Sequence, residues 1–245
     1  MINASIFCKP GFSEHKLYNE PITKLELLAL AIAAQRINNT YLKRGGEMGF
    51  VDKIDQGVPV SRYERVKQSN RFVMETVQQV NPHIITEELL KEANEMMINL
   101  EMDYMFKVLG DSLNDFETSI QQFLADDVEI EPRMHIGVVA YIPAYVEREV
   151  NTIAINERSM SSAYIGIKGD KITAEIEIIS KRQATQWDGW NVNAITIDGN
   201  RVSFFTTKDD LANKDGVFTI SAKVKDCSTV WGNSDIKETR LNYVK

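Results

Sequence analysis

The sequence has little that could crosslink the chain, bind a metal or span a membrane. It contains two cysteines, Cys8 and Cys227, and three histidines, and none of these occurs with the ligand spacing of a zinc site. Two widely separated cysteines fit a reducing compartment, although the sequence does not exclude a disulfide between them. No apolar run approaches the roughly 18 residues of a transmembrane helix, and the N-terminus lacks a signal-peptide pattern. We therefore predict a cytoplasmic protein without a cofactor or membrane contact.

Recognisable catalytic motifs are also absent. The chain has no Gly-x-Ser-x-Gly, His-Glu-x-x-His, Walker-type or Gly-x-Gly-x-x-Gly segment. Its carboxylate-rich stretches lack the Asp-x-Asp-x-Asp-Gly loop of a calcium site. They therefore fit a solvated face, or a docking surface for a basic protein, better than a metal site. We expect a protein that is not an enzyme and that functions by binding.

Charge is distributed unevenly along the 245 residues, whose net charge is −7. Residues 160–245 contain 12 Lys and Arg against 11 Asp and Glu, a net charge of +1. The residues before them therefore contain 16 basic and 24 acidic side chains, a net charge of −8. The acidic part would repel a polyanion, whereas the C-terminal part could bind one if its cations cluster. The length has room for two domains of ordinary size.

Helical periodicity dominates the first part of the chain. A central helix is expected at about 22–42, where apolar residues lie on all sides. After a loop, residues Ser61–Glu64 have the Ser-x-x-Glu pattern of a capping box and predict the start of a second helix, which bears a valine stripe. Thr86 is the predicted N-cap of a third. Residues 147–160 are polar and predict a connector between domains.

The last third of the sequence alternates apolar and polar residues with the period of β-strands. Asp198-Gly199-Asn200 predicts a tight hairpin turn, because Gly and Asn tolerate positive φ angles. The gap at residues 208–216 has room only for a turn. Five short strands in about 75 residues match an OB-like barrel. The strands are expected at 171–181, 190–198, 201–207, 217–225 and 236–245.

The predicted fold class is therefore α+β, with an N-terminal helical domain followed by a small five-stranded OB-like β-barrel. We place the acidic helical domain at residues 1–155 and the barrel at residues 156–245. The helical half is expected to dock a protein partner or a second copy of the chain as a homo-oligomer.

Three runs, 198–205, 216–225 and 238–241, resemble a C-terminal OB-type module of poorly characterised bacteriophage proteins of replication and recombination type. In that module a DGN-V-F hairpin precedes a G-x-V-K strand and a T-x-T-R final strand. The lead-in at 162–170 is also similar, so the resemblance covers about 85 residues, roughly a third of the chain. The chain departs from the pattern at Asp226-Cys227-Ser228, where His or Tyr is usual, and at Glu238-Thr239-Arg240. The resemblance implies a role in phage DNA metabolism in the host cytoplasm.

Aromatic and basic residues on the predicted barrel indicate a site for single-stranded nucleic acid. The tryptophans lie at predicted strand ends or loops, where bases could stack, and the cations could contact phosphates. Phe205 and Arg201 alternate to the face opposite Phe204. The same residues also fit packing of Trp187 and Trp190 against the helical domain, with the lysines on a solvated strand face. The predicted nucleic-acid-binding residues are Trp187, Trp190, Arg201, Phe205, Lys223, Lys225, Trp231, Lys237 and Arg240.

Two alternatives to nucleic-acid binding remain open from the sequence. The first is a protein-interaction or inhibitor module whose acidic surface binds a basic host or phage protein. The second is a structural component of a virion. The sequence does not distinguish DNA from RNA as a ligand.

Overall fold

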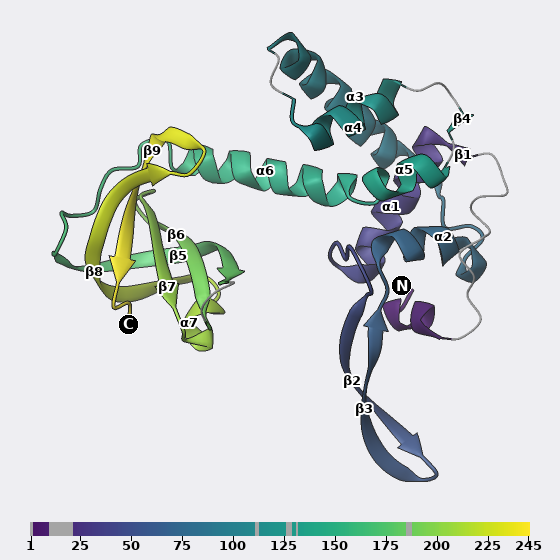
Figure 1. Ribbon diagram of the computed structural model, residues 1–245, viewed down its shortest axis with the longest axis horizontal. Helices are drawn as coiled ribbons and strands as arrows, with labels where there is room; N and C mark the ends of the chain where they lie inside the picture. The colour runs from purple at the N-terminus through teal and green to yellow at the C-terminus, as the bar shows by residue number, and fades with distance from the viewer. Residues whose placement is uncertain (1, 10–21, 111–112, 126–128, 131, 185–187) are drawn as a thin grey trace. The chain divides into compact units, whose positions relative to one another are not determined.

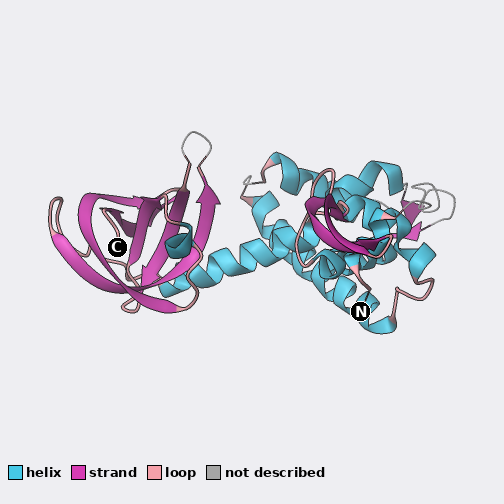
Figure 2. Cartoon of the chain, turned by 90° about the horizontal axis from the view of Figure 1, so that it is seen from below, coloured by secondary structure: helices cyan, strands magenta, loops and turns pink. Residues whose placement is uncertain are grey.

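The computed structural model describes residues 2–9, 22–110, 113–125, 129–130, 132–184 and 188–245. The chain is α+β, with helices followed by a five-stranded sheet (Figures 1 and 2). It divides into two compact units, Met1–Arg148 and Glu149–Lys245. None of the helices in the described ranges has the length and apolarity needed to cross a bilayer.

The N-terminal unit is built around one buried helix, α1. Every residue of α1 from Leu27 to Ala34 is buried, and α1 packs against α2, α3 and α5. Its N-terminus has a capping box, in which Thr23 Oγ1 accepts a hydrogen bond from the Glu26 N–H at 3.2 Å and Glu26 Oε2 accepts one from the Thr23 N–H at 2.9 Å. The elements up to the end of α6 are η1 (Ala4–Cys8), β1 (Ile22–Thr23), α1 (Lys24–Asn38), β2 (Glu47–Asp55), β3 (Val58–Lys67), α2 (Asn70–Val80), α3 (Glu87–Leu109), α4 (Asp115–Ala125), β4 (Glu129–Ile130), α5 (Pro132–Val139) and α6 (Ile142–Arg158).

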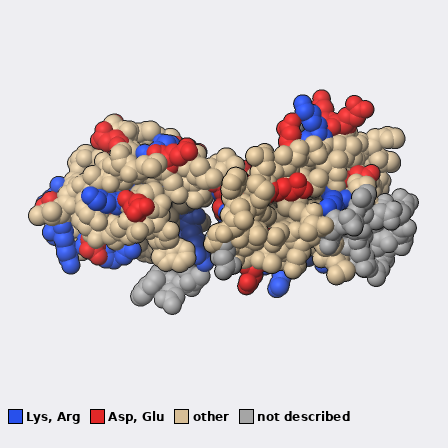
Figure 3. Space-filling model, turned by 90° about the horizontal axis from the view of Figure 1, so that it is seen from above, with Lys and Arg blue, Asp and Glu red and all other residues tan. Residues whose placement is uncertain are grey.

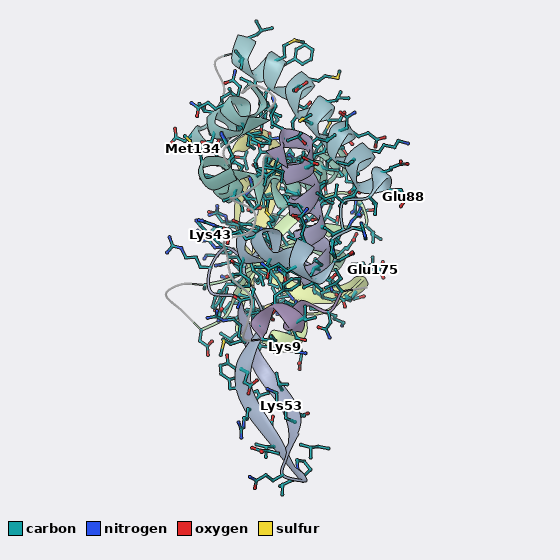
Figure 4. The ribbon with its side chains drawn as sticks, turned by 90° about the vertical axis from the view of Figure 1, so that its right-hand side faces the viewer. Lys9, Lys43, Lys53, Glu88, Met134 and Glu175 are labelled. Carbon is teal, nitrogen blue, oxygen red and sulfur yellow. The ribbon has the colours of Figure 1, made fainter. Side chains whose placement is uncertain are left out.

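Strands β2 and β3 form a projecting hairpin where the sequence analysis expected a loop and a helix start (Figure 1). That prediction is wrong. Ser61 and Glu64 are strand residues, and α2 begins only at Asn70, where Ser69 Oγ accepts the Phe72 N–H at 3.3 Å. Both faces of the hairpin are largely exposed, so neither produced the alternation by which buried strands are recognised. Figure 4 shows the hairpin, with Lys53, extending from the body of the unit.

Residues 147–160, predicted as a polar connector, contain the division between the two units and belong mostly to α6, which continues to Arg158. The helix contains Pro143 as its second residue, where the missing N–H has no intrahelical partner to lose. Thr86 is confirmed as the N-cap of α3, since its Oγ1 accepts the Leu89 N–H at 3.2 Å. The expected domain boundary at 155 falls within α6, as does the division between the two units.

The C-terminal unit is a sheet closed into a ring by hydrogen bonds in the order β5-β6-β7-β9-β8 (Figure 2). All neighbours are antiparallel except β7 and β9, which are parallel. The interior is apolar, with Ile176, Val202 and Ile220 fully buried. Between the third and fourth strands the chain forms a one-turn helix, so the prediction that this gap has room only for a turn is wrong. The elements are β5 (Lys171–Gln183), β6 (Trp190–Thr196), β7 (Arg201–Thr206), α7 (Asp209–Ala212), β8 (Val217–Val230) and β9 (Asn233–Asn242).

Candidate functional site

A groove of about 440 Å³ lies on the outer side of β6, β7 and β9, beside the β8–β9 turn. Alternation along β7 creates one wall, because Val202 and Phe204 point into the ring and leave Arg201 and Ser203 outside. The parallel register sets Glu238 beside Arg201 and continues along β9. The groove is lined by Asn191, Val192, Asn193, Arg201, Ser203, Phe204, Val230, Trp231, Glu238 and Arg240.

Arg201 is the unusual residue of this groove. It is only 7% exposed, and its Nε and Nη1 have no hydrogen-bond partner within the described ranges. Burial lowers the pKa of the Arg201 guanidinium, while the nearby Glu238 carboxylate opposes that shift. An arginine nevertheless stays charged at neutral pH. Buried donors on a charged group are costly to leave without acceptors, which sets Arg201 apart from the other residues of the groove.

Glu238 is the acidic member of the same cluster and is 8% exposed. Its Oε1 accepts a hydrogen bond from Ser203 Oγ at 2.9 Å and lies 3.7 Å from Arg240 Nε. Arg240 is exposed at the surface of β9. Two arginines against one glutamate give the cluster a net positive charge, which suits a single phosphate better than a dense run of them.

Aromatic side chains flank the charged cluster. Trp231 is 98% exposed and lies in a two-residue turn, where Gly232 has a φ of +82° of the kind found at the third position of a type II turn. Phe205 points outward on β7 opposite Asn191. Its ring lies against Gly189, where an added Cβ would come within 2.6 Å of Phe205 Cζ. The glycine therefore leaves room for this ring position.

The structure brings Arg201, Trp231 and Arg240 together in the groove. Phe205 shares their outward side of the sheet but does not line the groove, and the other predicted site residues lie elsewhere. Trp190 points to the inner side of β6 and packs on the ring interior. Its indole N–H donates to Asp209 Oδ1 at 2.7 Å. Trp190 therefore packs within the C-terminal unit. Trp187 lies outside the described residues.

The predicted lysines are also dispersed. Lys223 lies opposite Lys171 and lines a separate concavity with Lys171, Tyr243 and Lys245. Lys225 is exposed next to a bulge in β8, and Lys237 points to the other side of β9 from Glu238, with its ammonium 5.6 Å from the centre of the Tyr164 ring. None of the three predicted lysines lines the groove beside Arg201. On the face seen in Figure 3, acidic and basic side chains are interspersed over this unit.

Sequence reasoning missed several groove residues, among them Asn191, Asn193, Ser203 and Glu238. Ser203 could have been predicted from the sequence, because it lies midway between Arg201 and Phe205 and alternation along the strand places all three side chains on the same outer side. No local pattern marked Glu238, because its place beside Arg201 follows from the parallel β7–β9 pair and not from sequence spacing.

A buried carboxylate in the N-terminal unit differs from Arg201 in being fully paired. Glu117 is 4% exposed and accepts hydrogen bonds from the Tyr145 hydroxyl at 2.7 Å and the Asn114 N–H at 2.9 Å, and it pairs with Lys107. Burial alone would raise the pKa of Glu117, but these hydrogen bonds and the charge of Lys107 outweigh it and lower the pKa. The arrangement stabilises the helical packing and leaves no acceptor for a ligand.

Other reactive groups are sparse. Both cysteines are free thiols, and burial raises the pKa of Cys8 despite the opposing charge of Arg65. Among the described residues, no group of three or more His, Cys, Asp and Glu could hold a metal ion. Comparisons of the chain with protein-family models, with curated proteins and with solved structures gave no match.

Proposed function

We propose that the C-terminal unit is an OB-like barrel that binds single-stranded nucleic acid in the groove beside Arg201. Support for the fold comes from the closed five-strand order and from the one-turn helix between the third and fourth strands. In OB-folds, oligonucleotides bind on the face of the second and third strands and between the loops that follow strands one and four. Here those strands are β6 and β7, and the loop after the fourth strand contains Trp231.

The observation that supports the proposal is the buried guanidinium of Arg201 at the wall of this groove, whose Nε and Nη1 have no hydrogen-bond partner among the described residues. A backbone phosphate would supply the missing acceptors, and arginine binds phosphate through two parallel N–H groups. Arg240 on the neighbouring strand supplies a second, exposed cation. The exposed rings of Trp231 and Phe205 offer stacking surfaces for bases, each worth about 1–3 kcal/mol.

The charge of the groove limits the affinity. Only two arginines line it, and Glu238 lies beside both. Each phosphate contact to a single strand contributes about −0.7 to the slope of log K against log salt, so two contacts give a slope of about −1.4. Binding should therefore be modest and depend strongly on stacking. The resemblance to phage modules of replication and recombination type favours a role in phage DNA metabolism.

Fluorescence titration with a short single-stranded oligonucleotide at low and moderate salt tests the proposal. We expect quenching of tryptophan emission, a slope near −1.4, and a loss of affinity in an Arg201→Gln/Arg240→Gln variant. A Lys223→Gln/Lys225→Gln variant removes the same number of charges from outside the groove and is the matched control. Absence of binding at low salt, or equal loss of affinity in both variants, would contradict the proposed site.

A further inference from the structure

Two bare apolar surfaces lie on the N-terminal unit. The first, here called the hairpin face, consists of Met48, Phe50, Ile54 and Tyr63. In the β2–β3 register these residues share one side with Asp52, Ser61 and Arg65, because Phe50 lies opposite Tyr63 and side chains at every second position point the same way. Phe50 and Ile54 are 75% and 78% exposed, and the rings of Phe50 and Tyr63 lie 5.1 Å apart.

The opposite side of the hairpin carries Val51, Val58 and Val60 together with ion-paired side chains. There Lys53 pairs with Glu64, and Arg62 pairs with Asp55. These cross-strand ion pairs satisfy the charges within the hairpin and suit a face in contact with water. An isolated two-stranded hairpin is only marginally stable without a packed face. The larger exposed apolar side chains, Phe50, Ile54 and Tyr63, all lie on the first side, so this is the side that a partner would cover.

The second surface, here called the α3 stripe, lies on the last three turns of α3. Its members are exposed, with Leu109 at 81%, and they recur at the three- and four-residue spacing that places side chains on one side of a helix. Other residues of α3, including Leu100 and Tyr104, face the core of the unit and are buried. The stripe consists of Ile98, Met102, Met105, Phe106 and Leu109.

We propose that copies of this chain associate head to tail, with the hairpin face of one copy on the α3 stripe of the next. The two surfaces lie at opposite ends of one compact unit, so a copy cannot bring its own hairpin to its own stripe (Figures 1 and 4). One heterologous contact covers both surfaces. The aromatic residues alone bury about 150–250 Å² each, which brings the contact within reach of the roughly 1,000 Å² of a specific interface.

Charge distinguishes this contact from pairing of two α3 stripes. Residues 87–109 contain six acidic and two basic side chains, whereas residues 47–67 contain four of each. Two α3 helices would therefore oppose net charges of −4, which disfavours their association. The hairpin is neutral overall and has Arg65 opposite Met48 on its apolar side. It therefore meets the acidic helix without repulsion.

The test measures the mass of the full-length chain in solution by light scattering over a concentration series, without nucleic acid. A hairpin variant, Phe50→Ser/Ile54→Ser, and a stripe variant, Met102→Ser/Leu109→Ser, change only exposed side chains, and circular dichroism checks their folding. Val58→Ser is the matched control, since Val58 is exposed near the same turn but on the ion-paired side. We expect the wild type and the control to gain mass with concentration, and each double variant to associate at least about tenfold more weakly.

Mixing the two double variants gives the sharper result. One copy then contributes an intact stripe and the other an intact hairpin, so the mixture should form dimers but no larger assemblies. A wild type that is monomeric at every concentration would overturn the proposal. It would also be overturned if the stripe variant assembled normally while the hairpin variant did not, since that outcome means hairpin-to-hairpin pairing. Because no nucleic acid is present, the result is independent of the proposed function.

Discussion

Replacing Trp231 with alanine separates ligand binding from stability more cleanly than any other change in the groove. The side chain is 98% exposed in the β8–β9 turn, so its removal takes away almost no packing. Surface substitutions of this kind change the free energy of unfolding by no more than about 0.5 kcal/mol. Trp231→Ala should therefore unfold at the same denaturant concentration as the wild type.

The same substitution should weaken binding of single-stranded nucleic acid substantially. One stacked base contributes about 1–3 kcal/mol, which corresponds to a roughly 5- to 150-fold higher dissociation constant. Fluorescence anisotropy of a labelled oligonucleotide at low salt measures this change without relying on the tryptophan that has been removed. Stacking on an uncharged ring leaves the phosphate contacts intact, so the salt slope should stay near its wild-type value.

Trp190→Phe is the control for this measurement. It keeps an aromatic ring on the interior of the unit but removes the indole N–H that donates to Asp209. We expect a loss of about 1 kcal/mol in the free energy of unfolding and unchanged binding. If Trp231→Ala binds as tightly as the wild type, or Trp190→Phe binds more weakly than Trp231→Ala, the assignment of the groove is refuted.

Three further predictions follow from charge and backbone geometry. Arg240→Gln should make the salt slope shallower by about 0.7, whereas Lys223→Gln should leave it unchanged, as measured by anisotropy over a salt series. Folding lowers the pKa of Glu117, so its ionised carboxylate stabilises the folded state. This stabilisation is complete at pH values above the unfolded-state pKa of about 4.3, and it is lost as the pH falls through the lower pKa of the folded state. Urea unfolding at acidic pH should therefore show a weaker pH dependence for Glu117→Gln, which should also lose about 2 kcal/mol at neutral pH. Gly46→Ala should lower the free energy of unfolding by at least about 2 kcal/mol, because φ is +73° and the new Cβ would lie 1.8 Å from the Lys67 carbonyl oxygen.

Each of these has an outcome that contradicts it. Equal salt slopes for the two charge variants would mean that Arg240 contacts no phosphate. A steeper acid dependence for Glu117→Gln would reverse the inferred direction of the pKa shift. Gly57→Ala is the control for Gly46, since Gly57 has a φ of +82° but no atom within 4 Å of an added Cβ. If Gly57→Ala is as damaging as Gly46→Ala, the contact with Lys67 is not the cause.

The C-terminal strands could be predicted because each buries one side. The alternation in β5 and β8 is the direct result of an apolar ring interior, and the positive φ of Gly199 confirms the predicted turn. The hairpin at 47–67 could not be predicted in this way, because both of its sides are largely exposed. In addition, Ser61 and Glu64 have the Ser-x-x-Glu spacing of a helix capping box, although both are strand residues.

For the site, the sequence predicts which side chains of one strand point outward, but not which strands are neighbours. Alternation correctly placed Arg201 and Phe205 outside the ring, and the turn placed Trp231 near the surface. It could not show that Lys223 lies on β8 opposite β5, away from the groove, because outward residues of different strands in a closed ring point in different directions. The order of the strands decides which outward residues are neighbours, and that order is not a local property.

The parallel pairing of β7 with β9, here called the seam, determines at which stage of folding the groove forms. One wall comes with the β6–β7 hairpin and the other with the β8–β9 hairpin, and the seam joins residues distant in sequence. Such non-local pairs form late in folding, after the hairpins themselves. Arg201 and Arg240 thus become neighbours only at that last step. A bound anion that bridges them would hold the seam closed and slow hydrogen exchange at its amides, while exchange within each hairpin would change little.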